Sequence, residues 1–554
     1  MHEIKKQNIK FNVLAIFLII VLCFAISPVS LQNDTFYTIK IGELIVQNGI
    51  DMQDHFSWHE NLPYTYPHWA YDVIIYGIYN VFGLVGIYIS TVILACILGI
   101  SIYITNYKIS KNKIVSLIVS LIAIYLLKDF VAARAQLVTF ILFTLTILCI
   151  EQLLETKKKR YLVFLIIIPL LIANLHVAVW PFYFVLFIPY IAEFLICLLI
   201  KLHPITYIKI AFFMIKEIFV KEEVKKDIQN KIDYLCLDIQ KNEIESKKTK
   251  CKIIIEQNNT LKWLCVVIII AAFTGLCTPL KDTPYIYLLK TMQGNTTQNI
   301  NEHLPLTLIE NKEILATFTA FLAILMLTDT KIKLRDFFML SGLVLLSLIS
   351  RRQTSMFVII TSPIFSNLIC SLISKRDIKI YKILEKLFMS YVGKILIVSS
   401  ILLWAVILLK PKLNEKFIDN TTYPIQAAKY ITENLQLDKI RLYNEYNYGS
   451  YLMFKGIPVF IDSRADLYAP EFNKLKKQDG HYESRDIFSD FLNISSIATF
   501  YENKFEEYGI THVLTEKKSK LNLLISRDSN YERLYGDDYF VIYKRLSYAN
   551  KERE

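Results

Sequence analysis

Charged side chains stand at the edges of several long apolar runs in this sequence, where they could act on a polar group at a membrane surface. Asp34 follows the first apolar run, Arg134 precedes a later one, and Arg351 and Arg352 separate two more. A carboxylate can accept or orient the proton of an attacking hydroxyl, while the arginine fork holds the oxygens of a phosphate leaving group. This combination predicts group transfer from a phosphate-linked donor, with Asp34 as the catalytic carboxylate and the arginines on the phosphate.

Other polar residues in separate segments are candidates for the same site. They are Asp54, His68, His176, Glu302 and His303, with Asp462, Arg464 and Asp466 as candidates on the acceptor side. No spacing typical of metal ligands stands out, so the cofactor is unknown and a divalent metal stays open.

Each candidate also has a plainer interpretation, which the sequence leaves open. An aspartate after an apolar run is often a solvated helix end, and arginines at such positions often extend toward lipid headgroups. The histidines could be hydrogen-bonding residues at the interface. Asp462, Arg464 and Asp466 could form a salt-bridged turn that satisfies itself, instead of binding a sugar or an acceptor at the end of a strand.

The elements that must position these residues are membrane-spanning helices. The 554 residues are 54% hydrophobic with a mean hydropathy of +0.38, and apolar runs long enough to cross a bilayer recur along most of the chain. We predict an α-helical polytopic membrane protein with about eleven spans. The spans are expected near 11–29, 84–105, 113–127, 135–152, 161–176, 180–201, 261–278, 313–330, 336–350, 354–373 and 395–410.

The charge distribution predicts the orientation. Residues 411–554 contain 21 Lys and Arg against 22 Asp and Glu, so the overall charge of +12 arises in the first 410 residues. Within those residues the basic side chains gather in alternate loops, as the positive-inside rule requires of cytoplasmic segments. We therefore expect a multi-pass plasma-membrane protein with a cytoplasmic N-terminus and an extracytoplasmic C-terminal domain. Nucleic acid is excluded as a partner.

We predict two main parts. Residues 1–410 form the transmembrane domain, with an outer loop at 30–83 and a cytoplasmic helical insert at 202–260. Within the loop, the Tyr-rich segment 69–82 is too short to span and predicts an interfacial helix, and 34–47 predicts a second. Residues 411–554 predict an α/β domain. Its expected elements are helices 424–435, 448–455 and 499–508, strands 439–444, 457–462 and 510–515, and a closing strand pair near 530–545.

The overall plan resembles that of bacterial membrane glycosyltransferases of the C-type (GT-C) fold, with an Asp soon after the first span, two interfacial helices in the first outer loop and a C-terminal outer domain. More narrowly, the chain is similar to a largely uncharacterised group of bacterial membrane proteins that share a series of short motifs in the same order. The matching stretches are Asp34-Thr35-Phe36-Tyr37, Gly42-Glu43, Gly49-Ile50, Asp54-His55-Phe56-Ser57, Pro67-His68-Trp69-Ala70, Arg134-Ala135-Gln136, Asn174-Leu175-His176, Glu302-His303-Leu304-Pro305 and Asp462-Ser463-Arg464. Departures from that group's pattern include His68 in place of Glu and His303 in place of Trp.

The resemblance implies a polyprenyl-phosphate-linked sugar as donor and a glycan, lipid or protein of the cell envelope as acceptor. It also implies that Asp34 is the general base or the carboxylate that orients the acceptor. Three other functions stay open at this stage. They are a non-catalytic membrane scaffold that binds a glycan or a partner, a flippase or transporter of lipid-linked glycans, and an oligosaccharide ligase or polymerase that uses a diphosphate-linked donor. A transporter usually carries charge at mid-membrane, and here only Glu193 is expected deep within a span.

Overall fold

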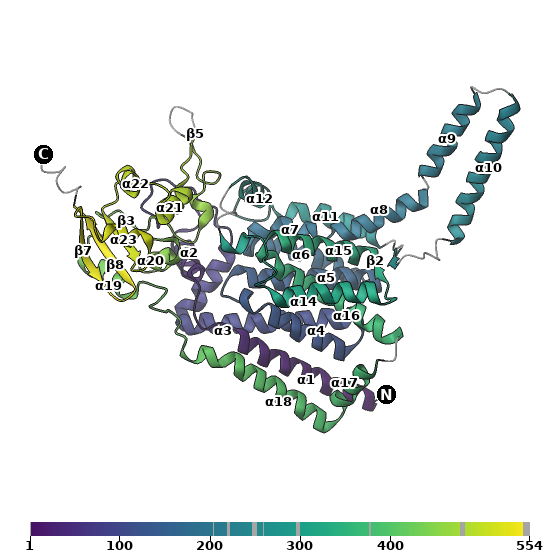
Figure 1. Cartoon of the computed structure of the whole chain (residues 1–554), viewed down its shortest axis with the longest axis horizontal. Coiled ribbons are helices and arrows are strands. Elements are labelled where there is room, and N and C mark those ends of the chain that lie inside the picture. The colour runs from purple at the N-terminus through teal and green to yellow at the C-terminus, as the bar shows by residue number, and fades with distance from the viewer. Residues whose placement is uncertain are drawn as a thin grey trace.

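A bundle of long helices makes up most of the computed structural model, which describes residues 2–202, 204–218, 222–245, 252–256, 258, 260–294, 300–375, 378–476 and 482–546. Figure 1 shows these helices running side by side along the long axis of the molecule. They are α1 (His2–Ile26), α3 (Trp69–Ser110), α4 (Lys113–Leu126), α5 (Ala135–Thr156), α6 (Arg160–Leu175), α8 (Ile188–Leu202), α11 (Leu261–Thr274), α14 (Lys312–Leu327), α15 (Leu334–Ile349), α16 (Thr354–Lys375) and α18 (Tyr391–Leu409).

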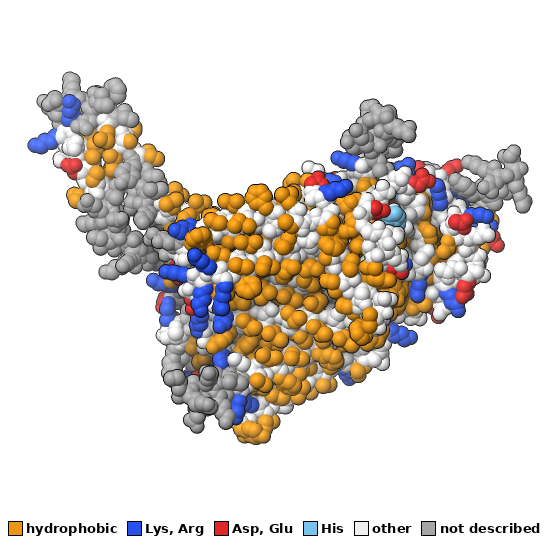
Figure 2. Space-filling view, turned by 180° about the vertical axis from the view of Figure 1, so that it is seen from behind, with side chains coloured by type: hydrophobic (Ala, Val, Ile, Leu, Met, Phe, Trp, Pro, Cys, Tyr) orange, Lys and Arg blue, Asp and Glu red, His pale blue; other side chains and the backbone are white. Residues whose placement is uncertain are grey.

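Each predicted span overlaps one of these helices. In the described part of the chain, five helical segments are long and apolar enough to cross a membrane: Trp69–Ser110, Ala135–Thr156, Val177–Leu199, Arg351–Lys375 and Tyr391–Asn414. Shorter apolar helices occupy Lys10–Ile26, Lys113–Leu126, Arg160–Leu175 and Leu261–Thr274. The chain therefore has the helices of a membrane protein, while eleven spans stays a prediction. Figure 2 shows a broad band of hydrophobic side chains over one face of the bundle.

Short elements connect these helices. The short helices are α7 (Trp180–Val185), α12 (Thr283–Gln293) and α17 (Lys379–Met389), with single 3-10 turns at Lys128–Phe130, Val177–Val179, Asn301–His303, Arg351–Gln353, Lys410–Asn414 and Ala465–Tyr468. Strands β1 (Ile253–Ile254) and β2 (Ile332–Lys333) pair in parallel.

The first outer loop is tightly folded against the bundle. Helix α2 (Asn33–Asn48) packs on the start of α3, as the amphipathic segment 34–47 predicts. Helix α3 is interrupted at Gly83, whose φ of 61° is in the left-handed region that glycine adopts at little cost. The interruption separates residues 69–82 from the long apolar remainder, which corresponds to the predicted boundary between an interfacial helix and a span.

The C-terminal region contains the sheet. Its four strands are β3 (Leu442–Tyr443), β6 (His512–Glu516), β7 (Tyr531–Gly536) and β8 (Phe540–Arg545), in the order β3-β6-β8-β7, with β3 parallel to β6 and the other pairs antiparallel. Helices α19 (Ile425–Asn434), α20 (Tyr446–Phe454), α21 (Ile487–Ser496), α22 (Tyr501–Tyr508) and α23 (Lys520–Ile525) accompany it. A two-stranded antiparallel pair, β4 (Leu475–Lys476) and β5 (Tyr482–Glu483), lies outside this sheet.

The predicted strand 457–462 is wrong, although the segment is extended. Its backbone pairs with the first outer loop and not with the sheet, because Trp58 N donates to Val459 O and Val459 N donates to Phe56 O, both at 3.2 Å. The outer loop is therefore the partner that the sequence pattern could not identify.

The outer loop and the C-terminal region share one hydrophobic core. Phe36 of α2 is fully buried, and its ring lies within about 5.5 Å of the rings of Tyr423, Tyr451 and Phe454. The Trp58 indole donates to the carbonyl of Leu442 on β3. This packing holds the sheet against one end of the bundle, as Figure 1 shows on the left.

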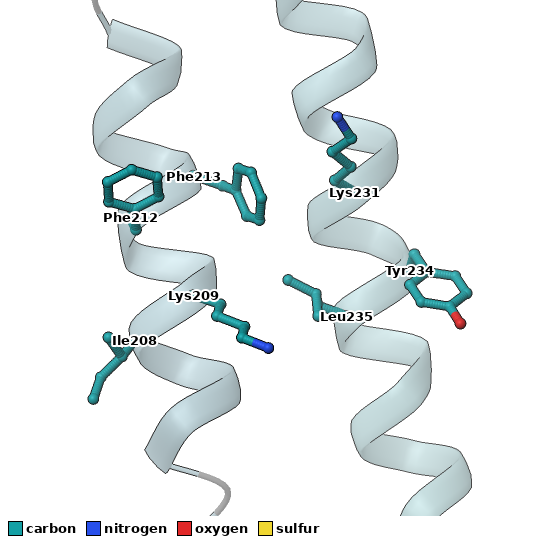
Figure 3. A pocket seen from close by; sticks show the side chains of 7 residues that line it. All are labelled: Ile208, Lys209, Phe212, Phe213, Lys231, Tyr234 and Leu235. Carbon is teal, nitrogen blue, oxygen red and sulfur yellow. The ribbon is translucent and has the colours of Figure 1, made fainter.

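A helical hairpin projects from the opposite end of the bundle. It consists of α9 (Pro204–Ile218) and α10 (Glu222–Glu245), as the sequence predicts for the first part of the insert 202–260, and several other insert residues lie outside the described residues. Ile210, Ile228 and Ile232 form its small core. The groove between the two helices is lined by apolar side chains, two lysines and a tyrosine (Figure 3). It has no carboxylate in its lining and so lacks the groups expected of the predicted site.

The close contact of α2 with α3 depends on Gly42. A Cβ atom at this position would lie 2.1 Å from the carbonyl oxygen of Asp72. We expect Gly42→Ala to destabilise the protein by about 1–3 kcal/mol, because the two helix backbones would have to separate. Thermal unfolding of the purified protein in detergent measures this. Gly77→Ala in α3 is the control, since nothing lies within 4 Å of its Cβ position. Equal melting temperatures for the two variants would contradict the prediction.

Candidate active site

One cavity of about 810 Å³ lies where the end of the bundle meets the C-terminal region. Its wall combines residues from α2, α5, α7, α12, α15, α16 and the loop after Asp462. Most of the candidates identified in the sequence line it: Asp34, His68, Arg134, His176, Glu302, His303, Arg352, Arg464 and Asp466. Arg351, Asp54 and Asp462 do not.

Arg134 joins two carboxylates from distant segments. It stands immediately before α5, and its guanidinium lies 2.5 Å from Asp34 Oδ2 in the first turn of α2 and 2.9 Å from Glu302 Oε1. Burial acts to raise the pKa of Glu302, but the charges of Arg134 and Arg352 outweigh it and lower that pKa. Glu302 is therefore ionised at neutral pH, and Arg134 is neutralised by groups of the protein itself.

Arg352 lines the cavity without a counter-ion among the described residues. In the described part of the chain it makes no ion pair, and its side chain donates a long hydrogen bond of 3.4 Å from Nη1 to His303 Nε2. Burial and the charge of Arg352 lower the pKa of His303 to about 4, so this imidazole is neutral at pH 7 and accepts the hydrogen bond. Arg352 thus presents positive charge to the cavity.

The neighbouring Arg351 points elsewhere. Its guanidinium lies 2.9 Å from Glu310 and 3.1 Å from the Thr307 hydroxyl, and the side chain is partly exposed outside the cavity. The single 3-10 turn at Arg351–Gln353 directs consecutive side chains in different directions. Sequence alone does not distinguish the two arginines.

Arg464 is held in a buried ion cluster. Its guanidinium lies 2.6 Å from Asp54 in the outer loop and 2.6 Å from Asp462, and all three side chains are at most 2% exposed. Tyr468 also donates to Asp462 at 2.7 Å. Of the turn considered from the sequence, the Asp462–Arg464 pair exists, whereas Asp466 is bonded to Tyr287. Asp54 is an additional partner of Arg464, so the cluster ties the outer loop to the C-terminal region. Arg464 reaches the cavity wall with its charge already balanced.

Asp466 faces the cavity from the same loop. Its carboxylate accepts a short hydrogen bond from the hydroxyl of Tyr287 on α12. Burial raises the pKa of Asp466, and the hydrogen bond from Tyr287 and the charge of Arg352 only partly offset that effect. Tyr287 carries no signal in the sequence that marks it as part of a site.

The two histidines of the bundle side are fixed by neighbouring side chains. His176, between α6 and α7, lies 2.8 Å from the Thr139 hydroxyl of α5. His68 contacts Tyr37 and Asp72, and its ring centroid lies 6.2 Å from that of His176. Tyr37 belongs to the motif that begins with Asp34 but is not among the site residues predicted from the sequence, although it stands three residues after Asp34 and therefore on the same helix face.

The half of the cavity farther from these charges is apolar. It is lined by side chains of α5, α7, α15 and α16 and of residues next to them: Phe140, Phe143, Phe182, Val185, Leu186, Leu343, Leu346, Ile349, Met356 and Ile360. A ligand that combines a charged head with a hydrocarbon chain matches this division of the cavity.

Glu193 lies far from this site, at the bundle end next to the hairpin. It is fully buried on α8 and pairs with Arg335 of α15 at 2.9 Å, and Arg335 also contacts Glu151 and Glu256. The buried charge of Glu193 is therefore paired with a neighbouring helix. In the described residues, no group of three or more His, Cys, Asp or Glu side chains has the arrangement of a metal site.

Comparison with known proteins identifies the fold. No protein-family model matches the sequence, and no curated protein matches it. In three dimensions the chain is similar to the oligosaccharyltransferase of Archaeoglobus fulgidus in its apo form, with a TM-score of 0.50 and 12% sequence identity over 90% of this chain and 69% of that one. The predicted glycosyltransferase-like membrane fold is therefore confirmed at the level of the fold.

The Arg464 cluster should dominate the attachment of the outer loop. We expect Arg464→Ala to destabilise the protein by about 3–5 kcal/mol, because two buried carboxylates would lose their counter-charge. Thermal unfolding in detergent at pH 7 measures the loss, with the exposed Lys429→Ala as the control. Burial acts to raise the pKa of Asp54, but Arg464 and Ser57 more than offset it and lower that pKa. The contribution of this carboxylate is therefore present above about pH 4 and lost as the pH falls further. A melting temperature equal to that of the control would refute the role of the cluster.

Proposed function

We propose that this protein is an integral membrane glycosyltransferase that moves a sugar from a polyprenyl-phosphate donor to a cell-envelope acceptor. The observation that carries the proposal is Arg352, a cation without an ion pair in the described residues, in a cavity that also has an apolar half. A phosphate attached to a long hydrocarbon chain satisfies both features at once. The fold shared with an oligosaccharyltransferase supports transfer of a lipid-linked glycan as the kind of function.

In this proposal the donor lies across the boundary of the two halves. The polyprenyl chain occupies the apolar half between α5, α7, α15 and α16, and the phosphate binds Arg352. As the bond from the sugar to the phosphate breaks, the electron pair goes to the phosphate oxygen. A fixed guanidinium stabilises that developing charge without reorganisation.

Asp34 acts on the acceptor. Its carboxylate is fixed by Arg134, so one oxygen can accept the hydrogen bond of the attacking hydroxyl in a defined direction. Glu302 holds Arg134 from the other side and prevents it from competing for the phosphate. The loop that carries Arg464 and Asp466 covers the site and supplies the contacts with the acceptor.

We further propose that the site faces the outside of the plasma membrane. The basic loops that fix the orientation by the positive-inside rule include those at the hairpin end of the bundle, opposite the cavity. Arg352, which has no ion pair in the described residues, supplies the positive charge needed for one phosphate. A diphosphate-linked donor would require more positive charge. A transporter is less consistent with this arrangement, because the observed charge clusters lie at the two ends of the bundle.

The two adjacent arginines provide a matched test. Arg352→Gln should reduce transfer on the order of 10²–10³-fold, because the developing phosphate charge loses its counter-ion. Arg351→Gln should leave transfer unchanged, because its side chain pairs with Glu310 outside the cavity. The measurement is mass spectrometry of envelope glycans and lipids from cells that lack the protein or express each variant. The expected signal is a hexose- or pentose-sized increment. Equal effects of the two substitutions would overturn the assignment of the phosphate site.

Asp34→Asn should abolish the same increment while the protein still inserts and folds. The amide keeps the size of the side chain but loses the charge that fixes Arg134 and orients the hydroxyl. Folding is checked by size-exclusion chromatography and the melting temperature in detergent. Full transfer by this variant would remove Asp34 from the mechanism. An intact lipid-linked glycan accumulating on the wrong leaflet in cells without the protein would indicate a flippase instead.

A further inference from the structure

A chain of three side chains leads from the cavity wall into the protein. The Tyr37 hydroxyl lies 2.9 Å from His68 Nε2, and His68 Nδ1 lies 2.6 Å from Asp72 Oδ1. Tyr37 and His68 line the cavity, whereas Asp72 is completely buried behind them. An imidazole between a buried carboxylate and a hydroxyl is an arrangement that can move a proton.

The direction of the hydrogen bonds follows from the charge on Asp72. As a carboxylate Asp72 can only accept, and His68 Nδ1 then carries the hydrogen and donates it. His68 Nε2 is then free to accept the hydrogen of Tyr37. Burial raises the pKa of Tyr37, and the nearby charges of Asp34 and Asp72 add to this effect, so its hydroxyl is protonated at rest.

The surrounding helices hold this chain rigidly. Tyr37 is on α2, His68 immediately precedes α3, and Asp72 is in the first turn of α3. The missing side chain of Gly42 lets α2 approach the backbone of Asp72 itself. The rings of Tyr37 and His68 also stack, with centroids 5.6 Å apart. Positions set this closely are those required for proton transfer between hydrogen-bonded atoms.

Asp34 needs such a partner. Its Oδ2 lies 2.5 Å from the Arg134 guanidinium, so this oxygen is already held by a donor and the carboxylate serves to orient the hydroxyl. Tyr37 is on the same face of α2, three residues later, so a hydroxyl held by Asp34 also lies next to the phenol.

We propose that Tyr37, His68 and Asp72 form a proton relay that removes the proton of the acceptor hydroxyl during transfer. This inference rests on the proposed glycosyltransferase function. As the acceptor oxygen forms its bond to the sugar carbon, the bond from that carbon to the phosphate oxygen breaks. The acceptor proton passes to the Tyr37 oxygen, and the proton of Tyr37 passes to His68 Nε2. Asp72 balances the resulting imidazolium, and Arg352 balances the leaving phosphate. Tyr37 is the catalytic residue, and His68 and Asp72 act through it.

Substitutions at two tyrosines distinguish a role in proton transfer from a role in packing. Tyr37→Phe removes only the hydroxyl that begins the relay. Tyr71→Phe removes a buried hydroxyl that makes no hydrogen bond to any described residue, on a ring 6.5 Å from that of His68. In membrane vesicles that contain the native donor and acceptor, Tyr37→Phe should reduce the sugar increment on the order of 10²–10⁴-fold with an unchanged melting temperature. Tyr71→Phe should transfer like the wild type.

Chemical rescue tests His68. His68→Ala opens space for a small ring and keeps Asp72, which would balance a charged ring. Added imidazole should restore part of the transfer in this variant, and pyrazole, which has the same shape but is far less basic, should not. Equal effects of the two rings, or none, would overturn the role of His68.

The outcomes also separate this inference from the function on which it rests. If wild-type vesicles add no sugar, both the proposed function and the relay are wrong. If the wild type and Tyr37→Phe transfer equally well, the relay alone is wrong and its hydrogen bonds serve only to satisfy buried Asp72. If Tyr37→Phe is inactive and folded while Tyr71→Phe is active, the relay is supported.

Discussion

The buried ion cluster of Arg464, Asp54 and Asp462 determines how the first outer loop meets the C-terminal region. Two carboxylates from segments about 400 residues apart share one guanidinium, and none of the three side chains has more than 2% exposure. An arginine in such a position needs both partners, because one unpaired charge among them would be costly in a buried site. The outer loop is therefore fixed to the C-terminal region. The cavity is bounded by the bundle on one side and by the outer loop and the C-terminal region on the other.

Charge within the cavity is divided unequally between two arginines. Arg134 is neutralised by Asp34 and Glu302, so it works as a structural bridge that aims a carboxylate. Arg352 makes no ion pair in the described residues, and its side chain donates a hydrogen bond to a neutral imidazole, so it remains available to an anion. The two arginines thus have different tasks because their surroundings differ. Together with the apolar half of the cavity, this division favours a lipid-linked phosphate over a soluble one.

The charged side chains at the two ends of the bundle have different surroundings. At the hairpin end, Arg335 is surrounded by Glu151, Glu193 and Glu256, a cluster that joins α5, α8, α15 and the segment after the hairpin. At the other end, polar groups border an open cavity. Chemistry is expected only where charges face a space that a substrate can enter, and the proposed relay of Tyr37, His68 and Asp72 borders that same space.

The sequence by itself determined the membrane class, the approximate positions of the helices and the α/β character of the C-terminal region. Those properties depend on local composition and periodicity, which any segment carries within itself. The sequence also identified Asp34, Arg134 and Arg352 as candidates, because charge beside an apolar run is conspicuous. Only the tertiary structure decided between Arg351 and Arg352, since one turn of helix points adjacent side chains to different surroundings. It also turned the expected strand 457–462 into a partner of the outer loop, and brought Tyr37 and Tyr287 to the cavity. Each of these outcomes depends on contacts between residues far apart in the chain, which local patterns do not encode.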